Sequence, residues 1–125
     1  MAESELTTIA RHYARAAFAS AREKRSGLQK WSKMLNALGS VVSERVVVEK
    51  LDDPKLTTEE ASVLFEKLLG RELNKEGRNF INVLAEYGRL ELLPIIAYQY
   101  ELLKAEYEKT VNVEVISAYK ITKSE

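Results

Sequence analysis

Apolar side chains recur at helical spacing through most of this chain, and single glycines separate the segments in which they do so. From Ser4 to Arg25 the residues are strong helix formers without Gly or Pro, and Ser26 and Gly27 follow. A second segment, from about Leu28 to Val42, repeats the pattern, with apolar side chains at Trp31, Met34, Leu35 and Leu38. Both segments predict α-helices.

Two shorter helices are expected next. The segment Glu44 to Leu51 contains three β-branched valines, but it is short and is followed by Asp52, Asp53 and Pro54, so we predict a short helix. Thr57 with Glu60 three residues later forms a capping-box pattern, which predicts a helix that ends at Gly70.

The last two helices are bounded by Gly88 and by a proline. A fifth helix is predicted over roughly 75–87, before Gly88, and a sixth from about Leu90 to Lys109, with Pro94 tolerated in its first turns. Within the second helix, Gly39 is expected to mark a bend or an end.

The period changes after the sixth helix. Val111, Val113 and Val115 alternate with other residues, as they would in a strand. The expected fold is therefore all-α, a six-helix bundle over residues 1–109 followed by a short extended or strand-like tail over 110–125.

Composition limits what such a bundle can do. The 125 residues, 46% of them hydrophobic, suit one packed domain. Nineteen basic and nineteen acidic residues are interspersed, which argues against a nucleic-acid partner. The chain has no cysteine, and no uncharged apolar stretch is long enough to cross a bilayer, so we expect no thiolate site and no direct membrane insertion.

Residues that could carry chemistry are scarce. The one histidine, His12, falls on the polar side of the first helix, away from any cluster at metal-ligand spacing. The acidic pairs Asp52–Asp53 and Glu59–Glu60 lie at helix starts, where the macrodipole favours negative charge, and no glycine-rich phosphate loop is present. We expect no catalytic residue, no cofactor and no metal.

The first and fifth helices carry more apolar surface than a core requires. At about 100° per residue, the apolar residues of the first helix cover roughly 200°, whereas a surface helix needs a stripe only a little over 100° wide. The fifth helix has a similarly wide arc that includes Phe80, Val83 and Tyr87. Either both helices are enclosed in the bundle, or they share a groove that receives a partner helix.

Three segments of the chain match sequence patterns of one known protein family. The segment LTTIARHYARAAF matches an A-x-x-Y-A-x-A-x-F pattern through Ala10, Tyr13, Ala14, Ala16 or Ala17, and Phe18. The segment NKEGRNFINVLAEYGRLELLP matches through Asn79, Gly88, Arg89, Leu90 and Pro94. The tail VNVEVISAYKITKSE, with Ser117 and Ala118, is similar to a linker and the first strand of a smaller C-terminal domain. Through these three segments the chain resembles the family of ATP synthase delta subunits and the oligomycin-sensitivity-conferring protein.

The resemblance implies a non-catalytic stator subunit of the rotary proton-translocating ATP synthase. It implies that the bundle binds the catalytic head by receiving the N-terminal helix of an alpha subunit against helices one and five. The C-terminal domain, expected to be missing here after its start in residues 110–125, would hold the b subunit of the peripheral stalk. The complex would lie at the cytoplasmic face of a bacterial inner membrane. The residues chosen for the alpha-subunit helix are Ile9, Tyr13, Ala16, Ser20, Asn79, Phe80, Val83 and Tyr87.

The chain departs from the family pattern at two points, and one alternative function stays open. Many family members have proline where this chain has His12, which leaves the start of the first helix open, and the chain ends early in the expected second domain. The alternative function is a small all-helical RNA-binding factor of the antitermination type, against which the neutral charge weighs.

Overall fold

The structure is a computed structural model that describes the backbone of residues 3–124 and the side chains of residues 5–113. Within these residues it has six α-helices, two short 3-10 helices and no strand, so the all-α, six-helix prediction is confirmed. The helices are α1 Glu3–Arg22, α2 Gly27–Val42, α3 Arg45–Leu51, α4 Thr58–Leu69, α5 Lys75–Glu86 and α6 Leu93–Ser124, with the 3-10 helices η1 Gly70–Glu72 and η2 Leu90–Leu92.

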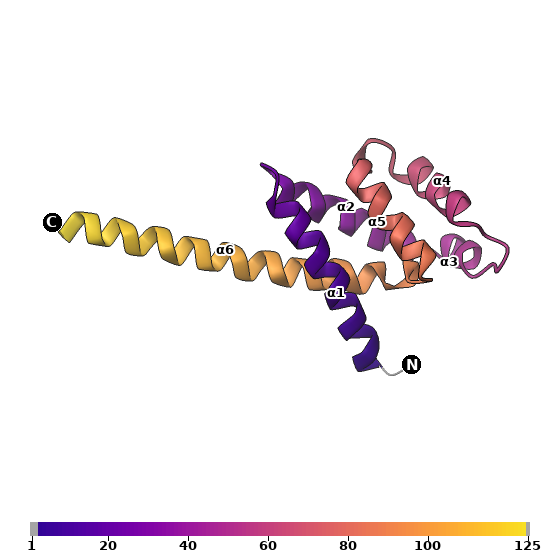
Figure 1. The fold of residues 1–125 in the computed structure, drawn as a ribbon, viewed down its shortest axis with the longest axis horizontal. Helices are drawn as coiled ribbons and strands as arrows, with labels where there is room; N and C mark the ends of the chain where they lie inside the picture. The colour runs from indigo at the N-terminus through magenta and orange to yellow at the C-terminus, as the bar shows by residue number, and fades with distance from the viewer. Residues whose placement is uncertain (1–2, 125) are drawn as a thin grey trace.

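Three helices form the main packing unit. α1, α2 and the first half of α6 pack against one another, while α5 packs mainly on α4 and α3 bridges α2 and η2. Figure 1 shows α6 crossing behind α1 and continuing away from the bundle, with α3 and α4 at the other end of the molecule. The protruding half of α6 thus leaves the bundle on the side away from α4.

The core is apolar and is centred on α2 and α6. Its largest fully buried side chains include Tyr100, Phe65, Met34 and Leu35. The Tyr100 hydroxyl is satisfied because it donates a hydrogen bond of 2.7 Å to the carbonyl oxygen of Leu28, and burial raises the pKa of this hydroxyl above its ordinary value. This bond ties α6 to the start of α2.

Helix caps explain several boundaries. The side chain of Thr57 accepts a hydrogen bond from the backbone N–H of Glu60 at 3.1 Å, and that of Asn74 accepts one from Gly77 at 2.8 Å. At the end of α5, Gly88 has a left-handed φ of 63°, its N–H donates to Ala85, and the N–H of Arg89 donates to Leu84 at 2.7 Å. These two hydrogen bonds form a Schellman motif, which ends α5 and explains why a glycine precedes Arg89 and Leu90.

Two predictions about the helices are wrong. The tail from residue 110 is not extended, because α6 continues through it to Ser124; no Gly or Pro interrupts residues 95–125, and the strand preference of alternating valines is weak. Gly39 does not end α2, which continues to Val42. It lies buried within the helix, where a side chain would come within 3.3 Å of the Cα of Pro94, so it allows α2 and α6 to approach closely.

The turn between α1 and α2 stores backbone strain at Ser26. This residue has a φ of 62°, in the left-handed region, and its side chain makes no capping hydrogen bond. Replacing Ser26 with Gly is therefore expected to raise the free energy of unfolding by about 1 kcal/mol, measured by urea denaturation. The matched control is Ser40→Gly, in the last turn of α2 and exposed, which should lower it by about 0.5 kcal/mol. Equal destabilisation by both changes would contradict this account of the turn.

A pair of carboxylates meets where α3 ends beside η2. The side chain of Asp52 raises the pKa of Glu91 above its ordinary 4.5, through a hydrogen bond that requires a proton, with burial and charge repulsion adding to the shift. Because the folded state holds this proton more tightly than the unfolded chain, the pair favours folding at low pH. That contribution is lost as the pH rises through the raised pKa.

Glu91→Gln removes the charge repulsion and is expected to stabilise the fold at pH 7 by a few tenths of a kcal/mol, a small effect because the site is exposed. Thermal melts of both proteins at pH 4 and pH 7 provide the check. The gain should disappear at pH 4, where the raised pKa leaves the Glu91 carboxyl mostly protonated in the wild type. A gain that is independent of pH would argue against the carboxylate pair.

A candidate helix-binding groove between α1 and α5

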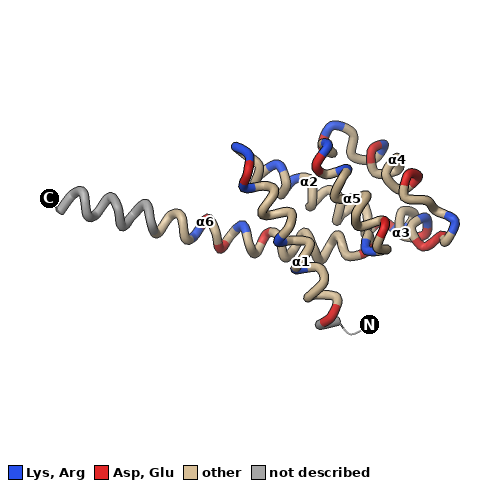
Figure 2. Tube along the Cα trace, in the orientation of Figure 1, with Lys and Arg blue, Asp and Glu red and all other residues tan. Residues whose placement is uncertain are grey.

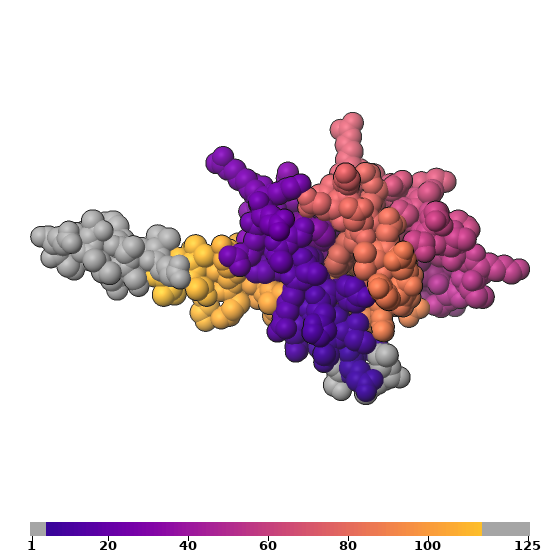
Figure 3. Space-filling view, in the orientation of Figure 1, coloured from indigo at the N-terminus to yellow at the C-terminus, as the bar shows by residue number. Residues whose placement is uncertain are grey.

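A mostly apolar groove of about 240 Å³ lies between α1 and α5. One wall consists of α1 residues and the other of α5 residues, and one α2 residue closes the floor. Figure 3 shows the two helices side by side on one face of the molecule. The lining residues are Ala16, Ala17, Ser20, Trp31, Glu76, Asn79, Phe80 and Val83.

Three aromatic rings fix the distance between the walls. Phe80 of α5 contacts Tyr13 of α1 edge to face, with ring centroids 6.3 Å apart, and contacts Trp31 of α2 in the same way at 5.4 Å. Such contacts stabilise packing beyond the area that they bury. They hold α1 and α5 apart at a fixed spacing, and the small side chains of Ala16 and Ser20 leave room between them.

The apolar arcs of α1 and α5 divide into a core side and an outer side. On α1, Ala10, Ala14, Ala17 and Ala21 are buried, while Ala16 is exposed. On α5, Ile81 and Leu84 are fully buried, whereas Val83 is 43% exposed and Tyr87 67% exposed. Only part of the wide apolar arcs therefore faces outward into the groove, at Ala16 of α1 and Val83 of α5. The large apolar side chains of α1 pack against the core instead, namely Leu6, Ile9, Tyr13 and Phe18.

Five of the eight predicted partner-binding residues line this groove, namely Ala16, Ser20, Asn79, Phe80 and Val83. Tyr13 lies beside it through its contact with Phe80. Ile9 is half-buried against the core, one turn before Tyr13 on α1, and Tyr87 stands at the C-cap of α5. Sequence reasoning missed Ala17, Trp31 and Glu76 as lining residues. Trp31 was expected only as a core residue, and its helical spacing gives no sign that it reaches a groove made by two other helices.

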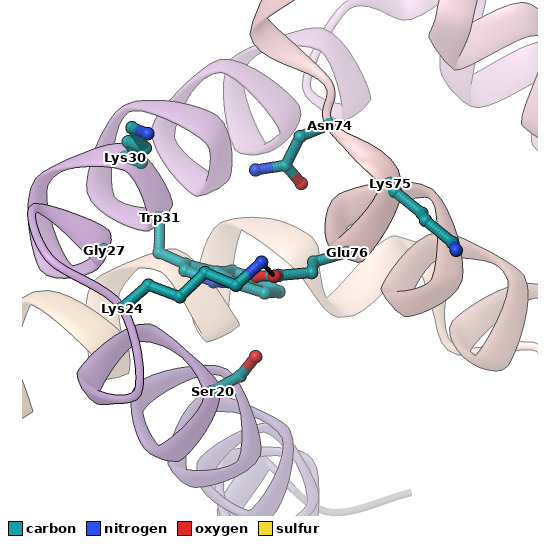
Figure 4. A pocket seen from close by; sticks show the side chains of 8 residues that line it. All are labelled: Ser20, Lys24, Gly27, Lys30, Trp31, Asn74, Lys75 and Glu76. Carbon is teal, nitrogen blue, oxygen red and sulfur yellow. Dashed lines mark ion pairs between the residues drawn. The ribbon is translucent and has the colours of Figure 1, made fainter.

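One end of the groove is polar. Beyond Ser20, Trp31 and Glu76 it continues into a second hollow of about 260 Å³, to which the α1–α2 turn and the start of α5 contribute. Figure 4 shows the Lys24 and Glu76 side chains paired above the Trp31 indole, with Lys30 and Lys75 at the sides. The Lys24–Glu76 ion pair lowers the pKa of Glu76 and raises that of Lys24.

Elsewhere the described residues offer no comparable site. No three His, Cys, Asp or Glu side chains among them gather closely enough to hold a metal ion, and no helix they form has the length and apolar character needed to span a membrane. His12 is exposed, as expected. Lys, Arg, Asp and Glu are mixed along the described part of the chain, which does not favour an RNA-binding surface (Figure 2).

Further apolar side chains are exposed on α3 and α4, at Val46, Val63 and Leu68, and on α6, at Tyr98 and Leu102. The hollow beside Tyr98 is lined largely by polar residues, among them Asn36, Ser40 and Glu101. The hollow at the α3–α4 connection has apolar residues such as Leu51, Leu56 and Leu90 beside Thr57, Thr58 and Glu91, but it is smaller, about 110 Å³. The α1–α5 groove is thus the best candidate for burying an apolar partner.

Comparison with known proteins identifies the family of the chain. A family model described as ATP synthase delta (OSCP) subunit matches residues 9–125. The ATP synthase subunit delta of Aliivibrio fischeri (strain ATCC 700601 / ES114) is 41% identical over 122 residues, which are 98% of this chain and 68% of the relative. The subunit delta of Psychromonas ingrahamii is also 41% identical over the same shares, and that of Bordetella avium is 38% identical over 95% of this chain and 66% of the relative. This chain belongs to the ATP synthase delta (OSCP) subunit family.

Proposed function

We propose that this chain connects the catalytic head of the ATP synthase to its peripheral stalk, and that the α1–α5 groove receives the N-terminal helix of an alpha subunit. Membership of the delta family supports the coarser statement, that the chain is a non-catalytic stator subunit of a membrane-associated complex. The groove supports the finer one, since its partly exposed apolar walls suit an amphipathic helix.

The observation that carries the proposal is the outward-facing apolar surface shared by α1 and α5. A helix seated in the groove would bury Val83, the exposed large apolar side chain of α5 that lines it. We propose that the same helix extends to Tyr87, the exposed C-cap residue one turn further along. Each large anchor buried in this way contributes roughly 1.5–3 kcal/mol before the cost of ordering is subtracted, so a few anchors give useful affinity.

The second connection is proposed to run through α6 and the residues that follow it in longer relatives. α6 has 32 residues and is therefore about 48 Å long. Its first half belongs to the core, and the guanidinium of Arg22 on α1 lies 4.7 Å from the ring centroid of Tyr107, at the point where α6 leaves the bundle. We propose that residues 110–125 join the bundle to a C-terminal domain that binds the b subunit.

In this position the chain has a mechanical role. Rotation of the central shaft exerts torque on the head, and a tight contact that dissociates slowly would hold the head against it. The location implied is peripheral, at the cytoplasmic face of the membrane.

Binding to the intact catalytic head tests the proposal. The chain has one tryptophan, and it lies on the floor of the groove, so its fluorescence reports directly on an occupant. We expect a saturable change when the chain is titrated with heads lacking their own delta subunit, and none when the alpha subunits lack their N-terminal helix. Equal binding to both kinds of head would contradict the proposal.

A further inference from the structure

We propose that the polar end of the groove recognises a carboxylate on the partner helix, and thereby sets the direction in which that helix lies. This inference rests on the proposed function, because it concerns the same occupant. It adds a chemical requirement that the apolar walls do not impose, namely an acidic residue at the end of the partner that reaches the α1–α2 turn.

The first argument is the charge of the hollow. Lys24, Lys30 and Lys75 line it and Glu76 is the one acidic residue among its lining residues, so three positive charges face one negative charge, a net of +2. Glu76 pairs with Lys24, while Lys30 and Lys75 make no ion pair within 4 Å among the described side chains. Figure 4 shows Lys75 directed away from the Lys24–Glu76 pair and Lys30 at the opposite side. Both side chains are exposed, so they can rotate toward an added carboxylate.

The second argument is a buried donor without an acceptor. Trp31 is 3% exposed, and its indole N–H makes no hydrogen bond of standard geometry in the structure, although it lies close enough to Glu76 to contribute to the lowered pKa of that residue. An unsatisfied buried N–H is costly. Lys24 and Glu76 cover the indole in Figure 4, and Lys24 is largely exposed, so rotation of its side chain would open the N–H to an incoming oxygen.

The third argument is the position of Lys75 as the first residue of α5. A cation at a helix N-terminus is opposed by the helix dipole, and an acidic residue there would be more favourable for folding. The dipole and the lysine both favour an anion in this hollow. Together with the lysines of α2 and the α1–α2 turn, they make the hollow a carboxylate site at one end of an apolar groove.

Lys75→Glu separates recognition from folding. The substitution should leave the midpoint of urea denaturation unchanged or raise it, because it improves the charge at the start of α5. The dissociation constant for a peptide that copies the alpha subunit's N-terminal helix should rise about tenfold at low salt, and less at high salt. Lys55→Glu, on the exposed α3–α4 connection, is the matched control and should bind as the wild type does.

The single indole N–H resonance gives a second readout. With the wild-type chain, the peptide should shift this resonance, and peptides with each acidic residue changed in turn to its amide should identify one whose loss abolishes the shift and weakens binding. Normal binding by all amide peptides and by Lys75→Glu would overturn the inference and leave the groove assignment standing. Failure of the wild-type chain to bind the unmodified peptide would overturn both.

Discussion

Gly27→Ala is expected to lower the free energy of unfolding by about 3 kcal/mol, at the upper end of the usual cost of overpacking. Gly27 is the first residue of α2 and is buried beneath the end of α1. A Cβ atom there would overlap the backbone carbonyl of Ala21, and main-chain atoms cannot rotate away as a side chain can. Relief requires that α1 and α2 move apart, which would also displace Trp31 from the groove.

Gly88→Ala is the control for this prediction. Gly88 has a left-handed φ of 63°, but no atom lies within 4 Å of the position a Cβ would take. Its replacement should cost only about 1 kcal/mol, for the backbone conformation alone. Urea denaturation followed by circular dichroism measures both values. If Gly88→Ala lowers the free energy of unfolding more than Gly27→Ala does, the close approach of α1 to α2 is not the reason why position 27 requires glycine.

Ala16→Asp is expected to weaken binding of the alpha-subunit helix at least a hundredfold, roughly 2.7 kcal/mol, because a partner in the groove would bury the new charge without a counterion. Ala16 is exposed in the free chain and lines the groove wall, so the fold should tolerate the change. Calorimetric titration gives the affinity and thermal melting gives the stability.

Ala19→Asp supplies the matched comparison, since Ala19 is also exposed on α1 and does not line the groove. It adds the same charge to the same helix, so long-range electrostatic effects are nearly equal in the two variants. A large difference in affinity would identify direct contact at Ala16. Similar affinities for both variants would mean that the partner does not lie against this edge of α1.

Much of the fold follows from local signals in the sequence. The spacing of apolar residues in α2, the capping residue Thr57 and the glycine after α5 predict helix boundaries to within a few residues, because each acts within one or two turns. The end of α6 could not be predicted in this way, since the alternating valines express a weak preference that an uninterrupted helix overrides. The role of Gly39 could not be predicted either, because the backbone that it packs against, at Pro94, is distant in the sequence.

The candidate site is partly visible in the sequence. The over-wide apolar arcs of α1 and α5 predict two walls, and the family resemblance suggests what lies between them. The floor and the polar end could not be predicted, because Trp31, Lys24 and Lys75 come from α2, a turn and a helix start that only tertiary packing brings together. The same packing turns Val83 and Tyr87 outward while Ile81 and Leu84 fill the core.

Mapping the alpha-subunit peptide on the chain by backbone chemical shifts tests the central claim most directly. We predict that the largest changes on saturation fall on Ile9, Tyr13, Ala16, Ser20, Asn79, Phe80, Val83 and Tyr87, with Trp31 responding from the floor of the groove. Changes centred instead on the exposed apolar residues of α3 and α4, Val46, Val63 and Leu68, would contradict the assignment of the partner to the α1–α5 groove.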